Sequence, residues 1–327
     1  MTTDPAAATI TTPLTALAGI RHPILLAPMD GTACARLAAA VSDAGGLGLL
    51  GGGYADPAWM EQELAAAEGS RVGAGFITFV LAERPRALGL VLEAKVPAVQ
   101  LSFGDPRPFA EEIKAAGALL ICQVQTDVEI DRALEAGADV LVAQGRDAGG
   151  HGRPDRGTMG LVPSLVDRAG DIPVVAAGGI SDGRGLAAAL MLGATGVSMG
   201  TRFLASVEAQ SSPAEAAGLV AAGAEDTRRT PVFDVVRGPA WPDGYDGRVV
   251  TNQLVQRWED DPAGVRDQRT ELKATYDASA PDDFTNRALW AGEGLDLVTS
   301  IDPAAAIVER MVASAAAQLT RAGDLLR

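Results

Sequence analysis

The chain has 327 residues, a formal net charge of −15 at pH 7, and only 4% aromatic residues. This acidic balance excludes nucleic-acid binding, which needs a basic face, and argues equally against an anionic membrane surface. The length is sufficient for one α/β barrel with an extension.

The two cysteines, Cys34 and Cys122, lie far apart in apolar segments and form no CxxC motif. This usage favours a reducing compartment, with both residues buried as small hydrophobes. Residues 1–20 lack the basic and apolar regions of a signal peptide, and no stretch approaches a transmembrane span. We therefore expect a soluble, cytoplasmic protein.

After a loose arm over residues 1–12, the chain shows eight short apolar runs, each followed by an amphipathic segment of helical length. The predicted strands begin near Ile24, Leu47, Val72, Ala98, Ala118, Asp139, Ile172 and Gly196. Their spacing of about 20 to 26 residues, with one interval of about 33, matches one βα unit each. Alternating strands and helices predict parallel strands with right-handed crossovers. Eight units favour a closed TIM (β/α)8 barrel over the alternative, an open doubly wound sheet.

Residues 46–51 match the GxGxxG pattern of dinucleotide-binding proteins. That fingerprint must follow a strand and open a helix. Here it follows a helical segment and runs through a predicted strand, so we interpret it as a chance match.

The pattern changes beyond the eighth strand. A helix over residues 213–222 is expected to close the barrel, and three of the four tryptophans follow it in the last third: Trp241, Trp258 and Trp290. They indicate a mostly helical cap, whose aromatic residues either form an apolar wall for a pocket or pack as an ordinary core. We expect a barrel over residues 1–222, a cap or substrate subdomain over 223–302, and a C-terminal helix over 303–327 that packs back on the barrel.

A glycine-rich loop, residues 144–152, follows the sixth strand and contains one of only two histidines. In an α/β barrel, the working residues follow the carboxyl ends of the strands, which is where His151 would lie. His22 precedes the first strand and would lie at the opposite face. His151 is therefore the imidazole placed for acid–base work, the alternative being a surface turn without a role. With no HExxH motif and no cysteine cluster, we expect no metal site.

Glycine-rich turns after the seventh and eighth strands, near residues 178–183 and 200–203, each lead to a helix start. Barrels bind phosphate at such turns, because backbone N–H groups and the positive end of a helix dipole face the anion. Gln123 and Gln144 end two neighbouring strands and can hydrogen-bond the edge of a polar heterocycle. Together these features suit a mononucleotide-type cofactor such as FMN. A phosphosugar ligand stays open as an alternative.

Several segments, taken in order, resemble the nitronate monooxygenases, formerly called 2-nitropropane dioxygenases, which are FMN-dependent barrels. The similar segments are residues 27–29, 72–77, 148–152, 176–185 and 200–203, and in the last third residues 237–242, 247–248, 252 and 290–294. The resemblance covers about residues 20 to 300. The family is also similar to the flavin enoyl-ACP reductases and the NADH:quinone reductases, which share the Ala-Gly-Gly-His segment.

The resemblance implies oxidation of alkyl nitronates, with nitroalkanes as a further substrate class, by O2 to a carbonyl compound and nitrite. His151 would be the base or the substrate anchor. The residues that would bind FMN are Ala27, Pro28, Met29, Phe76, Gln123, Gln144, Gly149, Gly150, Gly178, Gly179, Gly200 and Thr201. Gln123 departs from some relatives, which have lysine or histidine there, so a positive charge beside the flavin is absent.

Other functions fit the same residues. One is an FMN-dependent NAD(P)H:quinone or enoyl-ACP reductase, another is a phosphosugar isomerase or lyase without redox chemistry, and a third is a silent flavin-binding module. The sequence leaves open the use of NAD(P)H and the oligomeric state, a homodimer included. It also leaves open whether Arg146, Arg153 and Arg156 steer an anion or solvate their loop.

Overall fold

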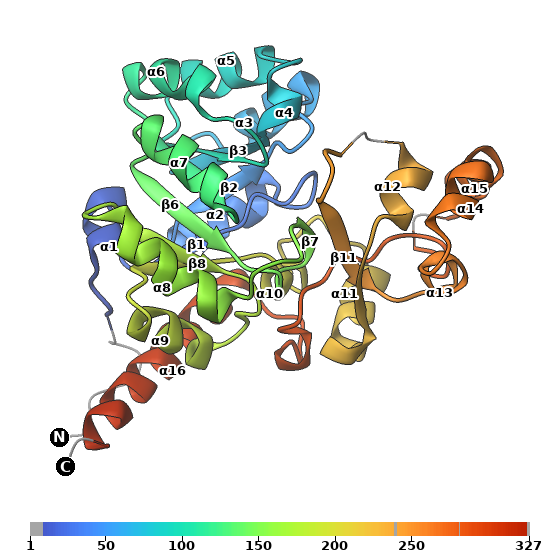
Figure 1. Ribbon diagram of the computed structural model, residues 1–327. Helices are drawn as coiled ribbons and strands as arrows, with labels where there is room; N and C mark the ends of the chain where they lie inside the picture. Colours follow the sequence, from blue (N-terminus) through green and yellow to red (C-terminus); the bar gives the residue numbers. More distant parts are fainter. Residues whose placement is uncertain (1–8, 239–240, 281, 326–327) are drawn as a thin grey trace.

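The computed structural model describes residues 9–238, 241–280 and 282–325 and contains a parallel eight-stranded sheet in the order β1-β9-β8-β6-β5-β4-β3-β2 (Figure 1). The strands are β1 (Ile24–Leu26), β2 (Gly48–Gly51), β3 (Val72–Ile77), β4 (Ala98–Ser102), β5 (Leu119–Val124), β6 (Val140–Gln144), β8 (Val174–Ala177) and β9 (Gly196–Met199). A parallel bridge between Leu25 and Leu47 joins β1 to β2 and closes the ring. The predicted TIM barrel is confirmed, and each strand starts within two residues of its predicted position.

Alternate residues of each strand face the inside and the outside of the barrel. In β1, Leu25 is fully buried in the barrel interior with Val142 and Val175. Its neighbours Ile24 and Leu26 are equally buried but belong to the outer layer, between the strands and the helices. Strands buried on both faces read as continuous apolar runs, which is why the sequence revealed them. The GxGxxG match of residues 46–51 runs into β2, as the chance-match interpretation requires.

Helices cover the outside of the barrel. They are α2 (Ala35–Asp43), α3 (Pro57–Ala66), α4 (Thr78–Leu81), α5 (Arg86–Glu93), α6 (Arg107–Ala115), α7 (Asp127–Glu135), α8 (Thr158–Ala169), α9 (Gly183–Met191) and α10 (Thr201–Leu204). The first helix, α1 (Pro13–Ala18), instead packs Leu14 and Ala18 against the interior residues of the barrel. The glycines at the helix–strand junctions have the left-handed backbone that ends a helix, for example Gly117 at φ +81° and Gly137 at φ +67°. At the other end of α7, Thr126 and Glu129 form a reciprocal capping box.

The C-terminal helix α16 (Ala304–Asp324) takes the eighth helical place, where it packs against both α9 and α2. Figure 1 shows it beside α9. The expectation that a helix over residues 213–222 closes the barrel was wrong. That helix, α11 (Pro213–Ala221), has two buried residues, and its Leu219 packs in a separate cluster with Leu289. The 21 residues of α16 provide a longer apolar stripe with six buried residues, and these belong to the main core.

A small subdomain, the cap, stands beside the barrel at the right of Figure 1. It contains β10 (Thr227–Thr230), β11 (Asp246–Val250), α12 (Val232–Arg237), α13 (Gln253–Trp258), α14 (Pro262–Asp267), α15 (Arg269–Ala278) and the short 3-10 helices η2 (Ala224–Asp226) and η3 (Leu295–Leu297). Phe233, Val255 and Trp258 form its own hydrophobic core. The glycine-rich loop after β6 contains a short strand, β7 (Gly150–Gly152), which pairs antiparallel with β11. The cap is thus joined to the barrel through the segment that carries His151.

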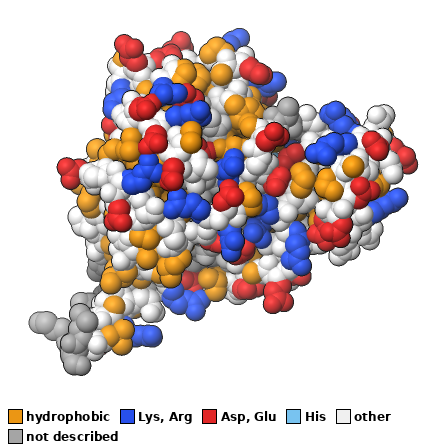
Figure 2. Space-filling view, in the orientation of Figure 1, with side chains coloured by type: hydrophobic (Ala, Val, Ile, Leu, Met, Phe, Trp, Pro, Cys, Tyr) orange, Lys and Arg blue, Asp and Glu red, His pale blue; other side chains and the backbone are white. Residues whose placement is uncertain are grey.

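Acidic and basic side chains are interspersed over the face of the molecule seen in Figure 2. No helix in the described ranges combines the length and the apolar composition needed to cross a bilayer.

Candidate active site

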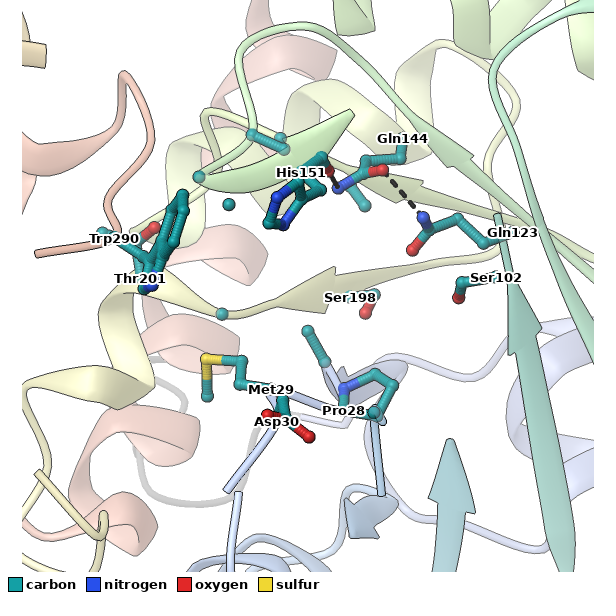
Figure 3. Close-up of a pocket in the computed structure, with 18 of the residues that line it drawn as sticks. Pro28, Met29, Asp30, Ser102, Gln123, Gln144, His151, Ser198, Thr201 and Trp290 are labelled. Atoms are coloured by element: carbon teal, nitrogen blue, oxygen red, sulfur yellow. Dashed lines mark hydrogen bonds between the residues drawn. The ribbon is translucent and has the colours of Figure 1, made fainter. Parts of the chain in front are cut away.

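A cavity at the carboxyl ends of the barrel strands brings the predicted site residues together. Its lining includes His151 and every residue assigned to the cofactor from the sequence: Ala27, Pro28, Met29, Phe76, Gln123, Gln144, Gly149, Gly150, Gly178, Gly179, Gly200 and Thr201. Figure 3 shows His151, Gln144 and Gln123 along one wall, with Pro28 and Met29 across the cavity from them. His22 is buried just before β1, away from this cavity, and burial lowers its pKa.

A chain of glutamine amides lies along one wall of the cavity. Gln123 donates from Nε2 to Oε1 of Gln144 at 2.8 Å, and Gln144 donates from Nε2 to the carbonyl of His151 at 3.2 Å (Figure 3). Behind them, Gln100 donates to Oε1 of Gln123 at 3.5 Å. Each of the two amide groups therefore keeps one N–H and one oxygen lone pair that can bond a ligand.

The turns after β8 and β9 offer hydrogen-bond donors to an anion. Gly178 and Gly179 have positive φ angles of +111° and +69°, and their N–H groups donate no hydrogen bond within the described residues. Oγ1 of Thr201 accepts from the N–H of Gly292 at 3.1 Å, which leaves its hydroxyl proton for a ligand. The expected contribution of the α9 N-terminus is not available, because Asp182 caps the first amides of that helix. The donors left for an anion at this turn are therefore its own amides.

His151 forms a close pair with an acidic residue of the cap. Its Nε2 lies 2.7 Å from Oδ1 of Asp234, and the two side chains are only 10% and 9% exposed. Asp234 lies on α12, and its Oδ2 is buried without a partner among the described residues. Asp234 was not predicted as a site residue, because no spacing or motif links it to position 151.

Two tryptophans of the cap enclose the imidazole. The ring of Trp241 stacks on His151 with a centroid distance of 3.6 Å and an interplanar angle of 4°, and Trp290 lies 5.1 Å from the same ring. The barrel holds Trp241 in turn, since its Nε1 donates to the hydroxyl of Tyr54 at 3.1 Å. Both sequence-based readings of the cap aromatics are therefore correct, because Trp241 and Trp290 line the cavity while Trp258 packs in the cap core.

Arg229 fixes the backbone on both sides of His151. Its guanidinium donates to the carbonyls of Arg146 and Ala148 at 3.0 and 3.2 Å, and to that of Gly152 at 2.9 Å. Burial lowers the pKa of Arg229 to about 10. Its acceptors are backbone carbonyls rather than carboxylates, so Arg229 serves to hold the position of β7.

The three arginines of the His151 loop lie outside the cavity lining. Arg153 pairs with Asp155 at 3.3 Å and Arg156 with Asp127 at 3.4 Å, while Arg146 is exposed. This arrangement supports the solvating role over steering of an anion.

The cavity wall carries three further titratable residues that were not predicted as site residues, Asp30, Tyr54 and Arg237. Burial raises the pKa of Asp30 and that of Tyr54.

In the part of the chain that the structure describes, no group of three or more histidine, cysteine or acidic residues could hold a metal ion. Both cysteines are buried and unpaired, and burial raises the pKa of Cys122 to about 12.

Known proteins resemble this chain over nearly its whole length. A family model described as nitronate monooxygenase matches residues 11–70 and 76–314. The nitronate monooxygenase npaC of Metarhizium robertsii is 38% identical, with 91% of this chain and 92% of the relative covered. Among solved structures, FabK from Thermotoga maritima has a TM-score of 0.87 at 31% identity, over 97% of this chain and 100% of that one. A nitroalkane oxidase from Streptomyces ansochromogenes has a TM-score of 0.79 at 30% identity, with the same coverage of both chains.

Proposed function

The chain belongs to the nitronate monooxygenase family and is an oxidoreductase, and we propose that it uses FMN and O2 to oxidise alkyl nitronates, and nitroalkanes, to a carbonyl compound and nitrite. The observation that carries this proposal is the cavity itself. It combines a paired imidazole, an anion-binding turn and hydrogen-bonding amides at the carboxyl ends of the strands of one barrel.

Members of this family are flavoproteins, and the hydrogen-bonding groups that line the cavity would suit the phosphate and the polar ring edge of FMN. The free N–H groups of Gly178 and Gly179 and the hydroxyl of Thr201 would hold the phosphate. Glycine at position 200 lets Met29 lie close to this turn, since a Cβ there would come within 3.2 Å of Sδ of Met29. Ala27, Pro28 and Met29 would contact the ring, and the amides of Gln123 and Gln144 would bond its polar edge. When bound, FMN would supply the two-electron acceptor that O2 then reoxidises.

His151 would act on the substrate through its second ring nitrogen. Asp234 engages Nε2, which holds the imidazole in one orientation and leaves Nδ1 for the substrate. A neutral Nδ1 can take a proton from the carbon next to a nitro group, and a protonated one can donate to a nitronate oxygen.

Two groups of the cap contact the His151 ring and would contact the imidazolium that proton transfer produces. The carboxylate of Asp234 would pair with that charge at hydrogen-bond distance. The face of Trp241, stacked on the ring, adds a cation–π attraction of about 0.5 to 2 kcal/mol. Both groups come from the cap, so we propose that the cap completes the catalytic machinery rather than simply covering it.

Anaerobic reduction of the flavin-loaded protein tests the proposed function. Propane-2-nitronate should bleach the flavin rapidly, and NADH should not. The reverse result would favour the NAD(P)H-dependent quinone or enoyl-ACP reductase. A colourless protein that takes up no added FMN would contradict the proposal. It would favour a phosphosugar or another non-redox ligand, although membership of this family does not favour that alternative.

A further inference from the structure

Arg237 is a cation on the cavity wall without a hydrogen-bond or ion-pair partner among the described residues. It ends α12, is partly buried and lines the cavity. Within the described residues its guanidinium makes no hydrogen bond or ion pair, and its contact is with Trp290, whose ring centroid lies 5.7 Å from Cζ. Other arginines of this region are paired: Arg248 bonds Glu293 at 2.7 Å, and Arg287 donates to the carbonyl of Ser279 at 2.8 Å.

Asp30 is an acidic residue of the same cavity wall that interacts electrostatically with Arg237, but it does not contact the guanidinium. The positive charge of Arg237 acts on Asp30 through space, but the two form no ion pair. Oδ1 of Asp30 instead accepts from the N–H of Tyr54 at 3.1 Å. A partly buried guanidinium that has lost water without gaining an acceptor is costly, and an anionic ligand would offset that cost.

Trp290 links Arg237 to the catalytic candidate. Its ring lies 5.7 Å from the guanidinium carbon of Arg237 and 5.1 Å from the ring of His151. An anionic group bound by Arg237 would therefore lie on the same side of the cavity as the imidazole. The remainder of the substrate would then face the indole rings of Trp290 and Trp241.

We infer that Arg237 binds the charged group of the substrate through two parallel N–H···O bonds and selects the ionised nitronate over the neutral nitroalkane. This inference rests on the proposed function, because it concerns the charge state of the substrate at the same site. A nitronate spreads its negative charge over two oxygens of one planar group, which matches the guanidinium fork as a carboxylate does. A neutral nitro group has the same shape without the net charge, so it gains less. Arg237 is a specificity-determining residue here, and it takes no part in proton transfer.

The variants R237Q and R237K test this inference, with R257Q as a matched control. Arg257 also lies over a tryptophan of the cap, 5.2 Å from the ring of Trp258, and is not part of the cavity lining. On the FMN-loaded proteins, KM and kcat are measured for propane-2-nitronate and for 2-nitropropane. Independently of turnover, nitrate is titrated as a planar anion and its Kd is read from the change in flavin absorbance.

In R237Q we expect KM for the nitronate and Kd for nitrate to rise by about 10- to 100-fold, since a hydrogen bond to a charged group contributes about 1.5 to 3 kcal/mol. The kcat for the nitronate should change by less than about threefold, and the kcat/KM for 2-nitropropane should fall by a smaller factor than that for the nitronate, because the negative charge on its oxygens develops only during deprotonation. R237K, which retains the charge but not the fork, should weaken both anions by at least about fivefold. R257Q should match the unmodified protein.

Unchanged nitronate KM and nitrate Kd in R237Q would overturn the inference while the proposed function stands. Should R237Q fail to fold, R237K decides, and values equal to those of the unmodified protein would overturn the bidentate site. If the unmodified protein consumes no nitronate but binds nitrate in a way that R237Q abolishes, the proposed function fails and the anion site stands. If it neither consumes nitronate nor binds nitrate, both fail.

Discussion

Nε2 of His151 and Oδ1 of Asp234 lie 2.7 Å apart although the two residues are separated by 83 positions. His151 belongs to the segment that leaves the barrel after β6, and Asp234 belongs to α12 of the cap. The pairing of β7 with β11 brings these two parts of the chain together. The chemistry proposed for the imidazole therefore depends on how the cap docks, and mutations of the pair separate its roles.

H151A should slow turnover of neutral nitroalkanes by about 10² to 10⁴-fold, the range that a positioned general base contributes. Preformed nitronates need no deprotonation, so their turnover should fall less. Nitrite release by the FMN-loaded variant, measured on 2-nitropropane and on its nitronate, checks both expectations. If the FMN-loaded variant releases nitrite from both substrates as fast as the unmodified protein does, His151 has no role in the mechanism.

D234N should retain the hydrogen bond to Nε2 but lose the negative charge that stabilises the imidazolium. A hydrogen bond to a charged partner contributes about 1 to 1.5 kcal/mol more than a neutral one, so kcat on 2-nitropropane should fall about tenfold. FMN content should be unchanged. D260N, at an exposed position of the cap, is the control and should behave as the unmodified protein does. Equal rates in D234N and D260N would contradict a role for the Asp234 charge.

R229K should lower the free energy of unfolding by about 2 kcal/mol or more, because an ammonium group cannot reach the separate carbonyls of Arg146, Ala148 and Gly152 at once. Urea unfolding measures this loss. Arg228, the preceding residue on β10, is exposed and provides the matched control R228K, expected to change stability by less than about 0.5 kcal/mol. If R229K and R228K have the same free energy of unfolding, Arg229 does not hold the His151 segment.

The barrel and its cavity lining were predictable because the order of strands and helices determines which residues meet at the rim of the barrel. Parallel strands that are buried on both faces are visible as apolar runs, and their carboxyl ends must meet at one rim, which brought Gln123, Gly178 and Thr201 together. The pairing of His151 with Asp234 was not predictable from local patterns. It arises from the fold of the cap, where side-chain contacts between segments far apart in the sequence leave no periodic signal.

Contacts between distant segments also explain two wrong predictions of secondary structure, the helix that completes the barrel and the strand β7. The helix that covers the barrel between α9 and α2 comes from residues 304–324 because α16 buries the longer apolar stripe, a comparison of packing that spacing alone does not make. The segment around His151 was expected as a loop because its glycines carry no strand propensity. Its strand partner, β11, begins only at Asp246.

D30N should stabilise the protein in a pH-dependent way. Burial raises the pKa of Asp30 above its ordinary value of 3.8, so the folded state binds this proton more tightly than the unfolded chain does. The stabilising contribution of the protonated carboxyl is complete below that ordinary value and is lost as the pH rises through the raised pKa. An asparagine stays neutral throughout and can still accept from the N–H of Tyr54. Urea unfolding of both proteins should therefore give nearly equal stabilities near pH 3.5 and a growing advantage of D30N toward neutral pH. A difference that stays constant with pH would show that Asp30 does not titrate as its burial requires.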